Sequence, residues 1–149
     1  MTIPFKPQEI ASQLLNKFPD SVTGTDDVCL WVKSENIAQV CGVLKTEWSL
    51  DFLVAVTGVD LIEYFEVVYH LNSISRNRSL VVKTRLYDRT APSLASVYGV
   101  WQGADLQERE VWDLFGITFE GHPNHKRIML WEGFPGHPHR KDFEDVVNY

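Results

Sequence analysis

The chain has 149 residues, of which 44% are hydrophobic and 23% are charged, and it carries a formal net charge of −6. This length and composition fit one globular domain with a single core, and they exclude a disordered or disulfide-stapled chain. The acidic balance argues against general binding to nucleic acid or to an anionic lipid surface, because both require a basic excess.

The first residues, MTIPFKPQEI, have no cationic end followed by a long apolar run, so they predict no secretory signal. The most apolar stretch, 52–59, is far shorter than the roughly 20 residues that span a bilayer. We therefore expect a cytosolic protein, or one that reaches a membrane only through a partner. Cys29 and Cys41 stand in apolar patterns at a spacing typical of neither an iron–sulfur cluster nor a zinc knuckle. They are interpreted as buried free thiols.

The first third of the chain predicts helices that alternate with a strand. Apolar residues recur at helical spacing over 8–18, and Pro19 ends this helix. A polar link follows, and then the alternating, β-branched pattern of 28–33 predicts a strand. Ser34 is expected to cap a second helix, whose apolar face covers 37–44.

Three further strands are predicted over 51–57, 64–71 and 79–87, because these segments are rich in Val, Leu and aromatic residues. Turn and polar residues separate them, and 73–79 is a plausible hairpin loop. Three consecutive strands of this kind predict a meander. A short helix is expected over 91–98.

A better helix is predicted over 105–115. Asp105 is expected to act as its N-cap, and Glu108, three residues on, completes a capping-box-like pair. Helical spacing places Arg109 opposite Asp113, where the two are expected to pair.

The charges of this helix favour an interface over a catalytic pair. Glu108 and Glu110 lie on different sides of one turn, so they converge poorly on a substrate. Solvation or ion pairing is the expected role of such charges. The neighbouring apolar residues of 111–115 make the helix a candidate for a protein–protein interface, where charges are paired as they are buried.

Regular structure is not expected after Gly116. Residues 116–149 hold four Gly and three Pro, yet they are too rich in apolar residues for a linker. The predicted fold class is a two-layer α+β domain, with a mixed or antiparallel sheet of about four to five strands flanked by helices. Residues 1–115 form its α+β part, and 116–149 form an extended C-terminal docking segment of the same unit.

Four histidines stand in the run GHPNHKRIMLWEGFPGHPHRKDF, at His122, His125, His137 and His139. Two imidazoles at such short spacing are compatible with a zinc site. However, no HExxH helix and no carboxylate at useful spacing completes the ligand set. A Gly-His-Pro turn is the alternative, in which Gly allows a sharp backbone path, His supplies a side-chain hydrogen bond and Pro stiffens the exit.

Basic residues in the same run form small spots on an acidic protein, at Lys126, Arg127, Arg140 and Lys141. Nucleic-acid binding would require more of them and no nearby acidic residues. Pairing with carboxylates of a partner subunit is favoured, because Arg suits bidentate ion pairs. No nucleotide-binding or nucleophile-elbow motif is present in the sequence.

The run EREVWDLFGITFEGHPNHKRIMLWEGFPGHPHRKDF (108–143) closely resembles the signature region of the NuoC-type, or 30-kDa, subunit of respiratory complex I. The match consists of an acidic helix core, a first Gly-His-Pro, an Arg with a hydrophobic run, a second Gly-His-Pro and an RKD-aromatic ending. It covers about a quarter of the chain. His139 departs from the family, in which Leu is common at that position.

The resemblance implies a non-catalytic subunit of the peripheral arm of a proton-translocating NADH:quinone oxidoreductase. The expected partners are the quinone-site (NuoD-type) and last-cluster (NuoB-type) subunits. FMN, iron–sulfur clusters and quinone are expected on other subunits, with no cofactor in this chain. The expected location is the cytoplasmic face of a bacterial cell membrane, with membrane contact only through the complex.

The resemblance also implies which residues meet the partners. The expected interface residues are Glu108, Arg109, Glu110, Asp113, His122, Arg127, His137, Arg140, Lys141, Asp142 and Phe143. The first four are expected either to fix the loop after the helix or to pair across the interface. Two alternatives stay open at this point. One is the equivalent subunit of a membrane-bound hydrogenase or of a ferredoxin- or F420-fed complex, and the other is a metal-dependent hydrolase that uses the four histidines.

Overall fold

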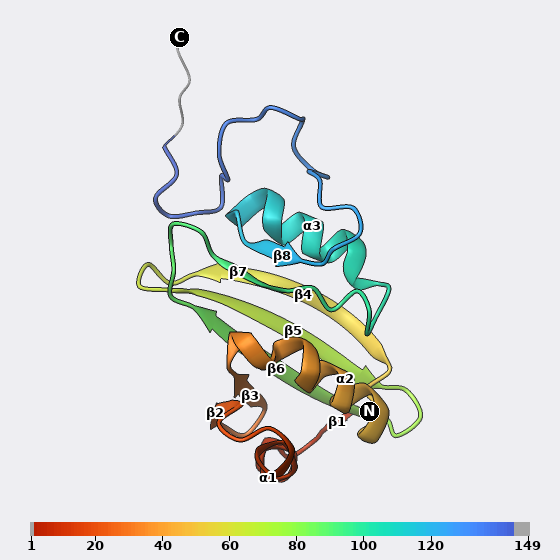
Figure 1. Cartoon of the computed structure of the whole chain (residues 1–149). Helices are drawn as coiled ribbons and strands as arrows, with labels where there is room; N and C mark the ends of the chain where they lie inside the picture. The colour runs from red at the N-terminus through yellow and green to blue at the C-terminus, as the bar shows by residue number, and fades with distance from the viewer. Residues whose placement is uncertain (1, 145–149) are drawn as a thin grey trace.

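A helix-covered sheet and a long irregular C-terminal segment make up the computed structural model, which describes residues 2–144 (Figure 1). The helices are α1 (Pro7–Lys17), α2 (Ile37–Glu47), which follows a 3-10 turn η1 (Ser34–Asn36), and α3 (Ala104–Phe115). The strands are β1 (Ile3–Pro4), β2 (Val22–Thr25), β3 (Cys29–Val32), β4 (Phe52–Asp60), β5 (Phe65–Ser73), β6 (Arg78–Leu86), β7 (Ser93–Ala95) and β8 (Thr118–Glu120).

The main sheet has six strands, with β2, β3, β6, β5 and β4 in that order and β1 paired to β6. Strands β4, β5 and β6 form the predicted antiparallel meander, whereas β3 runs parallel to β6. The sheet is therefore mixed, and the predicted α+β class is confirmed. Strands β1, β2, β7 and β8 were not predicted, because segments of two to four residues are held by pairing and carry little periodicity of their own.

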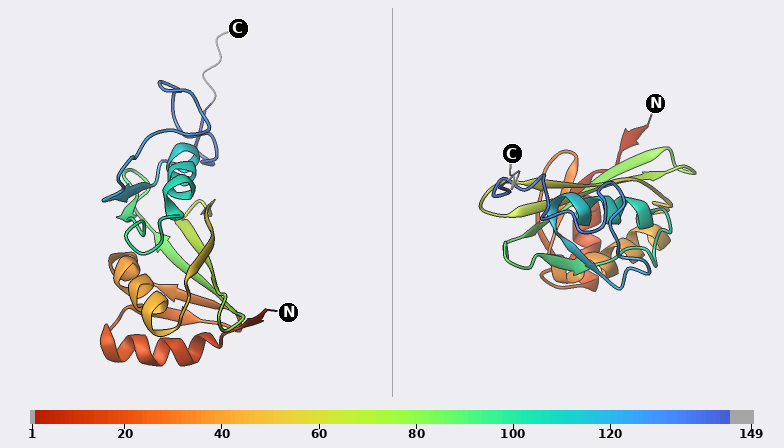
Figure 2. Two further views of the ribbon diagram at one scale, coloured as in Figure 1. Left: turned by 90° about the vertical axis from the view of Figure 1, so that its right-hand side faces the viewer. Right: turned by 90° about the horizontal axis from the view of Figure 1, so that it is seen from above.

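Helices α1 and α2 cover one face of this sheet, and the opposite face carries no helix of the described residues (Figures 1 and 2). The predicted apolar stripes are the buried ones, with Ile10 and Leu14 on α1 and Val40 and Leu44 on α2. They pack on the inward side chains of the meander. Burial of such side chains is the main stabilising contribution to the fold.

Helix α3 lies against β4, at the edge of the sheet. The Gln107 carboxamide accepts a hydrogen bond from Val56 N–H at 2.5 Å and donates to Val54 C=O at 3.5 Å, as a neighbouring strand would. Gly58 allows close contact, since a Cβ there would lie 2.9 Å from the Phe115 ring. The helix thus protects an edge strand and is fixed in place beside the C-terminal segment.

Several local predictions were wrong. The segment 91–98 is no helix, because it forms β7 and turns that are ordered by pairing with β8. Ser34 opens a 3-10 turn and supplies no side-chain cap. Helix α3 begins one residue earlier than expected, with Gly103 at the N-cap, so Asp105 lies inside the first turn.

Two further features concern the whole described region. Cys29 and Cys41 are free and buried, as predicted. None of the helices in residues 2–144 combines the length and the apolar character that a membrane-spanning helix requires.

Candidate docking site on the C-terminal strap

The irregular segment after α3, residues 116–144, is called here the C-terminal strap. Its two Gly-His-Pro turns have the predicted design. Gly121 and Gly136 adopt φ values of +83° and +89°, which favour glycine. The rings of His122 and His137 bond to backbone carbonyls, at 3.0 Å from Asp105 O and 2.9 Å from Asp113 O. The turns therefore tie the strap back to α3.

The fully buried Asp113 carboxylate holds the middle of the strap. Its Oδ1 accepts a hydrogen bond from Arg127 Nη1 at 2.6 Å. Its Oδ2 accepts from the backbone N–H groups of Ile128, Met129 and Leu130, at 3.3, 2.9 and 2.9 Å. Burial alone would raise the pKa of Asp113, but the N–H and guanidinium donors stabilise its charged form more, and the pKa lies below the ordinary value.

The Arg127 guanidinium extends the same network. Its Nη2 donates to Phe134 O and Gly136 O, both at 2.8 Å, and its Nη1 also reaches Asp113 O at 3.2 Å. The group lies 5.5 Å from the centroid of the Trp112 ring and 5.7 Å from that of Phe134. The Arg127 guanidinium was predicted to bind carboxylates or carbonyls of a partner, but it donates its hydrogen bonds to a carboxylate and carbonyls of the chain itself.

The second Gly-His-Pro turn packs directly on the end of α3. A Cβ on Gly116, where φ is +77°, would lie 2.7 Å from Cδ2 of His137. His139 donates its backbone N–H to Leu114 O at 2.9 Å, and its ring meets Phe115 edge-on with centroids 5.5 Å apart. The family departure at His139 therefore keeps a packing contact.

Arg109 does not pair with Asp113, contrary to the prediction from helical spacing. Its Nε donates to Lys126 O at 3.1 Å and its Nη2 to Arg127 O at 3.0 Å. Asp113 faces the strap's own guanidinium, which satisfies the carboxylate more fully than a neighbour on the helix surface could.

Glu108 is buried, so the predictions that it completes a capping box and that it is solvated are both wrong. Its carboxylate accepts hydrogen bonds from Ser96 Oγ at 2.5 Å and Val97 N–H at 3.0 Å. Burial raises the pKa of Glu108 despite these donors. Glu110 lies exposed on another side of the same turn, as predicted.

The first histidine pair is engaged in hydrogen bonds. His122 Nδ1 accepts from Asn124 N–H at 3.0 Å, and His125 Nε2 accepts from Phe119 N–H at 3.0 Å. Burial, followed by the proximity of His122, lowers the pKa of His125. Within residues 2–144 no three His, Cys, Asp or Glu side chains are grouped as a metal ion would need.

A carboxylate of the sheet, Asp60, anchors the end of the strap and was missed at the sequence level. Arg89 donates to both its oxygens, at 2.7 and 2.8 Å, and Lys141 N–H donates to Oδ2 at 2.8 Å. The Arg89 hydrogen bonds hold the pKa of Asp60 well below its usual range. Because Asp60 is a charged residue at the end of an apolar strand, the sequence indicates that an oppositely charged group lies near it. No rule of sequence spacing identifies Arg89 as that group.

Arg140 completes this anchor. It donates to both oxygens of Asp142, at 2.8 and 2.9 Å, and to Arg89 O at 2.8 Å, and its guanidinium lies 4.9 Å from the centroid of the Phe65 ring. The Arg140 hydrogen bonds lower the pKa of Asp142 to about 2. Lys141 is exposed and contributes only its backbone N–H to this anchor.

The polar anchors leave an apolar surface outside. Met129 and Trp131 are 62% and 66% exposed, and Ile128 is 38% exposed. Phe134 stacks on Phe143 with ring centroids 6.2 Å apart and planes 14° apart, and both are half-buried. The strap is thus a fixed backbone with large apolar side chains turned to solvent, which is the character of a protein-binding surface.

Comparison with known proteins bears on this arrangement. The sequence model of one family, described as "Respiratory-chain NADH dehydrogenase, 30 Kd subunit", matches residues 30–146. The C-2 subunit of NADH-quinone oxidoreductase from Rhizobium meliloti (strain 1021) is 45% identical, over 75% of this chain and 63% of that protein. The C subunit of the same kind of enzyme from Vesicomyosocius okutanii is 34% identical, over 91% and 82%.

A solved structure is also similar. A chain in the membrane-bound sulfane sulfur reductase, an archaeal respiratory membrane complex, is 28% identical and superimposes with a TM-score of 0.73, over 93% of this chain and 86% of that one. The chain spans somewhat less than two thirds of the Rhizobium relative's length. It belongs to the 30-kDa subunit family of the respiratory-chain NADH dehydrogenase.

Proposed function

We propose that this member of the 30-kDa family is a non-catalytic subunit of a respiratory NADH:quinone oxidoreductase, and that its C-terminal strap is a docking surface. The observation that carries the proposal is the exposure of Met129 and Trp131 on a backbone that buried Asp113 holds in place. A prearranged surface loses little conformational entropy when it binds, which favours stable association.

The partners proposed for this surface are the quinone-site (NuoD-type) and last-cluster (NuoB-type) subunits. We also propose that FMN, iron–sulfur clusters and quinone are bound by other subunits, and that the chain is a peripheral subunit on the cytoplasmic face of the membrane. Likeness to a chain of the sulfane sulfur reductase complex supports a second candidate, in which the same domain is the equivalent subunit of a related respiratory membrane complex.

The predicted interface residues contribute in two ways. Asp113, Arg127, His137, Arg140 and Asp142 shape the strap through contacts within the chain. The direct contacts are assigned to exposed groups, which include Glu110 and Lys141 together with Met129 and Trp131, which the predicted set did not contain. His122 and Arg109 hold the strap against α3, whereas Glu108 ties α3 to the turn that follows β7.

Replacement of the outward side chains tests the docking role. The double substitution Met129→Ala/Trp131→Ala is expected to reduce recovery of the subunit with the purified complex about tenfold or more, because large exposed aromatic residues dominate interfaces. The free energy of unfolding of the isolated chain should change by less than about 0.5 kcal/mol.

Ile74→Ala is the matched control, because Ile74 is 70% exposed on the β5–β6 hairpin and lies outside the strap. It should leave recovery unchanged. Recovery of the double variant at the level of the unmodified chain would refute docking through the strap.

A further inference from the structure

The sheet face opposite the helices carries a cluster of aromatic and charged side chains. Strand register places Trp31 of β3 beside Lys83 of β6, and Glu66 of β5 beside Arg85 of β6. Because successive side chains alternate along a strand, Lys83 and Arg85 point away from the helix face, to which the buried Val82 belongs. The side chains of Trp31, Glu66, Lys83 and Arg85 therefore lie together on the face of the sheet that no described helix covers.

One carboxylate in this cluster faces two cations. Glu66 receives Trp31 Nε1 at 3.4 Å and Arg85 Nε at 3.5 Å, and the ammonium of Lys83 lies 3.6 Å away. All three contacts are long for charge-assisted hydrogen bonds. Because two cations face one carboxylate, Glu66 balances only one of them. Asp26 also interacts electrostatically with Lys83, so the charge that stays unbalanced is that of Arg85.

Aromatic rings fix the orientation of the Arg85 guanidinium. It lies 4.7 Å from the centroid of the Tyr64 ring and 5.9 Å from that of Trp31, and its side chain is 41% exposed. Its contacts with Glu66 and with the Tyr87 hydroxyl occupy only part of a fork that has five N–H donors. Arg85 is therefore a positioned donor with capacity to bind a further acceptor.

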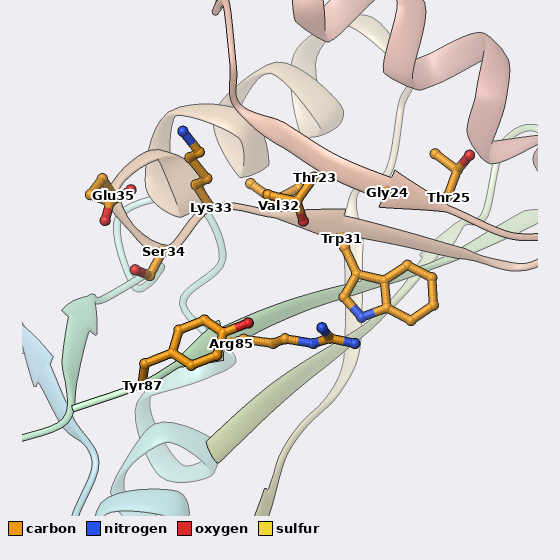
Figure 3. Close-up of a pocket in the computed structure, with 10 residues that line it drawn as sticks. All are labelled: Thr23, Gly24, Thr25, Trp31, Val32, Lys33, Ser34, Glu35, Arg85 and Tyr87. Carbon is orange, nitrogen blue, oxygen red and sulfur yellow. The ribbon is translucent and has the colours of Figure 1, made fainter. Parts of the chain in front are cut away.

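A pocket of about 530 Å³ opens beside this group, and it is called here the Trp31–Arg85 pocket. Figure 3 shows the Trp31 indole over the Arg85 side chain, with the Tyr87 hydroxyl turned toward the same side chain. Strands β2 and β3 and the turn 33–35 form the rest of the wall. Trp, Tyr and Arg are the residue types that contribute most at protein interfaces.

The chemistry of the pocket selects an acidic occupant. The guanidinium fork matches a carboxylate in two parallel hydrogen bonds, and the Trp31 ring lies on one side of the guanidinium. Lys33 and Glu35 also line the pocket and have opposite charges, so the Arg85 charge is the one in excess among the lining residues. Because the whole chain carries −6, attraction of an acidic segment depends on such a local site.

The pocket also borders the docking region. Tyr87 is two residues before Arg89, which is hydrogen-bonded to Asp142 at 3.3 Å and accepts from Arg140 at the end of the strap. A partner that covers the end of the strap would therefore lie close to the Tyr87 side of the pocket.

We propose that the Trp31–Arg85 pocket receives an Asp or Glu side chain from an acidic segment of a neighbouring subunit of the complex. The inference rests on the proposed function and adds a second contact, formed by charge, to the apolar contact of the strap.

Salt titration of the purified complex tests the pocket. Arg85→Gln should leave the subunit bound at low salt and release it at lower salt concentration than the unmodified chain, with about tenfold weaker association. Arg85→Lys, which keeps the charge beside Glu66 but lacks the fork, should lie between the two. Arg76→Gln on the β5–β6 hairpin is the matched control and should behave as the unmodified chain.

Carbodiimide cross-linking of the complex supplies a readout that does not depend on the stability of a variant. Lys83 should couple to Glu66 in every sample, because the ion pair is internal. Lys33 should couple to a carboxylate of another subunit in the assembled complex only. The pocket proposal would be overturned if the Arg85→Gln subunit were released at the same salt concentration as the unmodified subunit. It would also be overturned if Lys33 formed no link to another subunit in the assembled complex. If the Met129→Ala/Trp131→Ala subunit were still lost from the complex in that case, docking through the strap would remain supported although the pocket proposal had failed.

Discussion

The sheet with its helices and the C-terminal strap are stabilised by different chemistry. In the sheet, apolar side chains from β4, β5, β6, α1 and α2 are buried together, and the backbone is satisfied by regular pairing. In the strap, side chains such as Asp113 and Arg127 supply the hydrogen bonds that secondary structure would otherwise provide. A segment fixed in this way can leave Met129 and Trp131 outside, free to bind a partner.

The largest expected effect comes from Asp113→Ala. It leaves Arg127 without its carboxylate and three backbone N–H groups without an acceptor, at a cost of about 4 kcal/mol in the free energy of unfolding. Chemical denaturation measures that loss, and hydrogen exchange should speed up selectively at Ile128, Met129 and Leu130. Unchanged protection of these three amides would contradict the role of Asp113 as the anchor.

Leu80→Ala in β6 perturbs the other region. Leu80 is 1% exposed, and its truncation should cost about 3 kcal/mol through lost burial and a residual cavity. Here exchange should speed up through global unfolding, without selective loss of protection in the strap. A strap that opens first in this variant would show that the two regions are not stabilised separately.

Gly116→Ala tests the junction between the regions. The positive φ and the approach of His137 both oppose a Cβ, so a cost of about 2 kcal/mol is expected. Thermal unfolding measures the cost. Gly103→Ala is the control, because a Cβ there meets nothing within 4 Å and φ is −62°. Equal losses in the two variants would argue against a specific contact with His137.

Acid should affect the strap end through Asp142 and Asp60. The pKa values of both carboxyls are lower in the folded chain than the value near 3.8 expected in the unfolded chain. Their contribution to the free energy of unfolding is therefore fully present above pH 3.8. It is lost as the pH falls through the folded-state pKa, which is about 2 for Asp142. The contribution of Glu108 depends on pH in the opposite direction, because its pKa is raised in the folded chain. It stabilises the fold fully below pH 4.5, the ordinary pKa of a Glu side chain, and this contribution is lost as the pH rises.

Asp142→Asn is the smallest of these perturbations, because the side chain is half-exposed. It should cost under about 1 kcal/mol at neutral pH and should reduce the acid dependence between about pH 4 and pH 2. Denaturation curves recorded across that range measure the difference. An unaltered acid profile would remove Asp142 from the anchor at the end of the strap.

Periodicity in the sequence was sufficient to predict α1, α2, α3 and the meander, since apolar spacing reflects which side chains a single core can bury. The paired Gly-His-Pro turns were also predicted correctly, because the glycine and proline restrict the local backbone. Local spacing was misleading where distant segments compete for a group. Arg109 and Asp113 are neighbours on a helix, yet each binds the strap.

Local patterns were enough to establish the class of fold, the order of its main elements and the family resemblance, because each of these is written in short stretches of the chain. The folded arrangement was needed to show that Asp60 and Arg89 close the strap, that Glu108 is buried, and that Trp31 and Arg85 meet across separate strands. Asp60 binds Arg89, which is 29 positions away in the sequence, and the backbone of Lys141, which is 81 positions away. The raised pKa of Glu108 results from its burial in the folded chain. No local pattern records either a distant pairing or a loss of water.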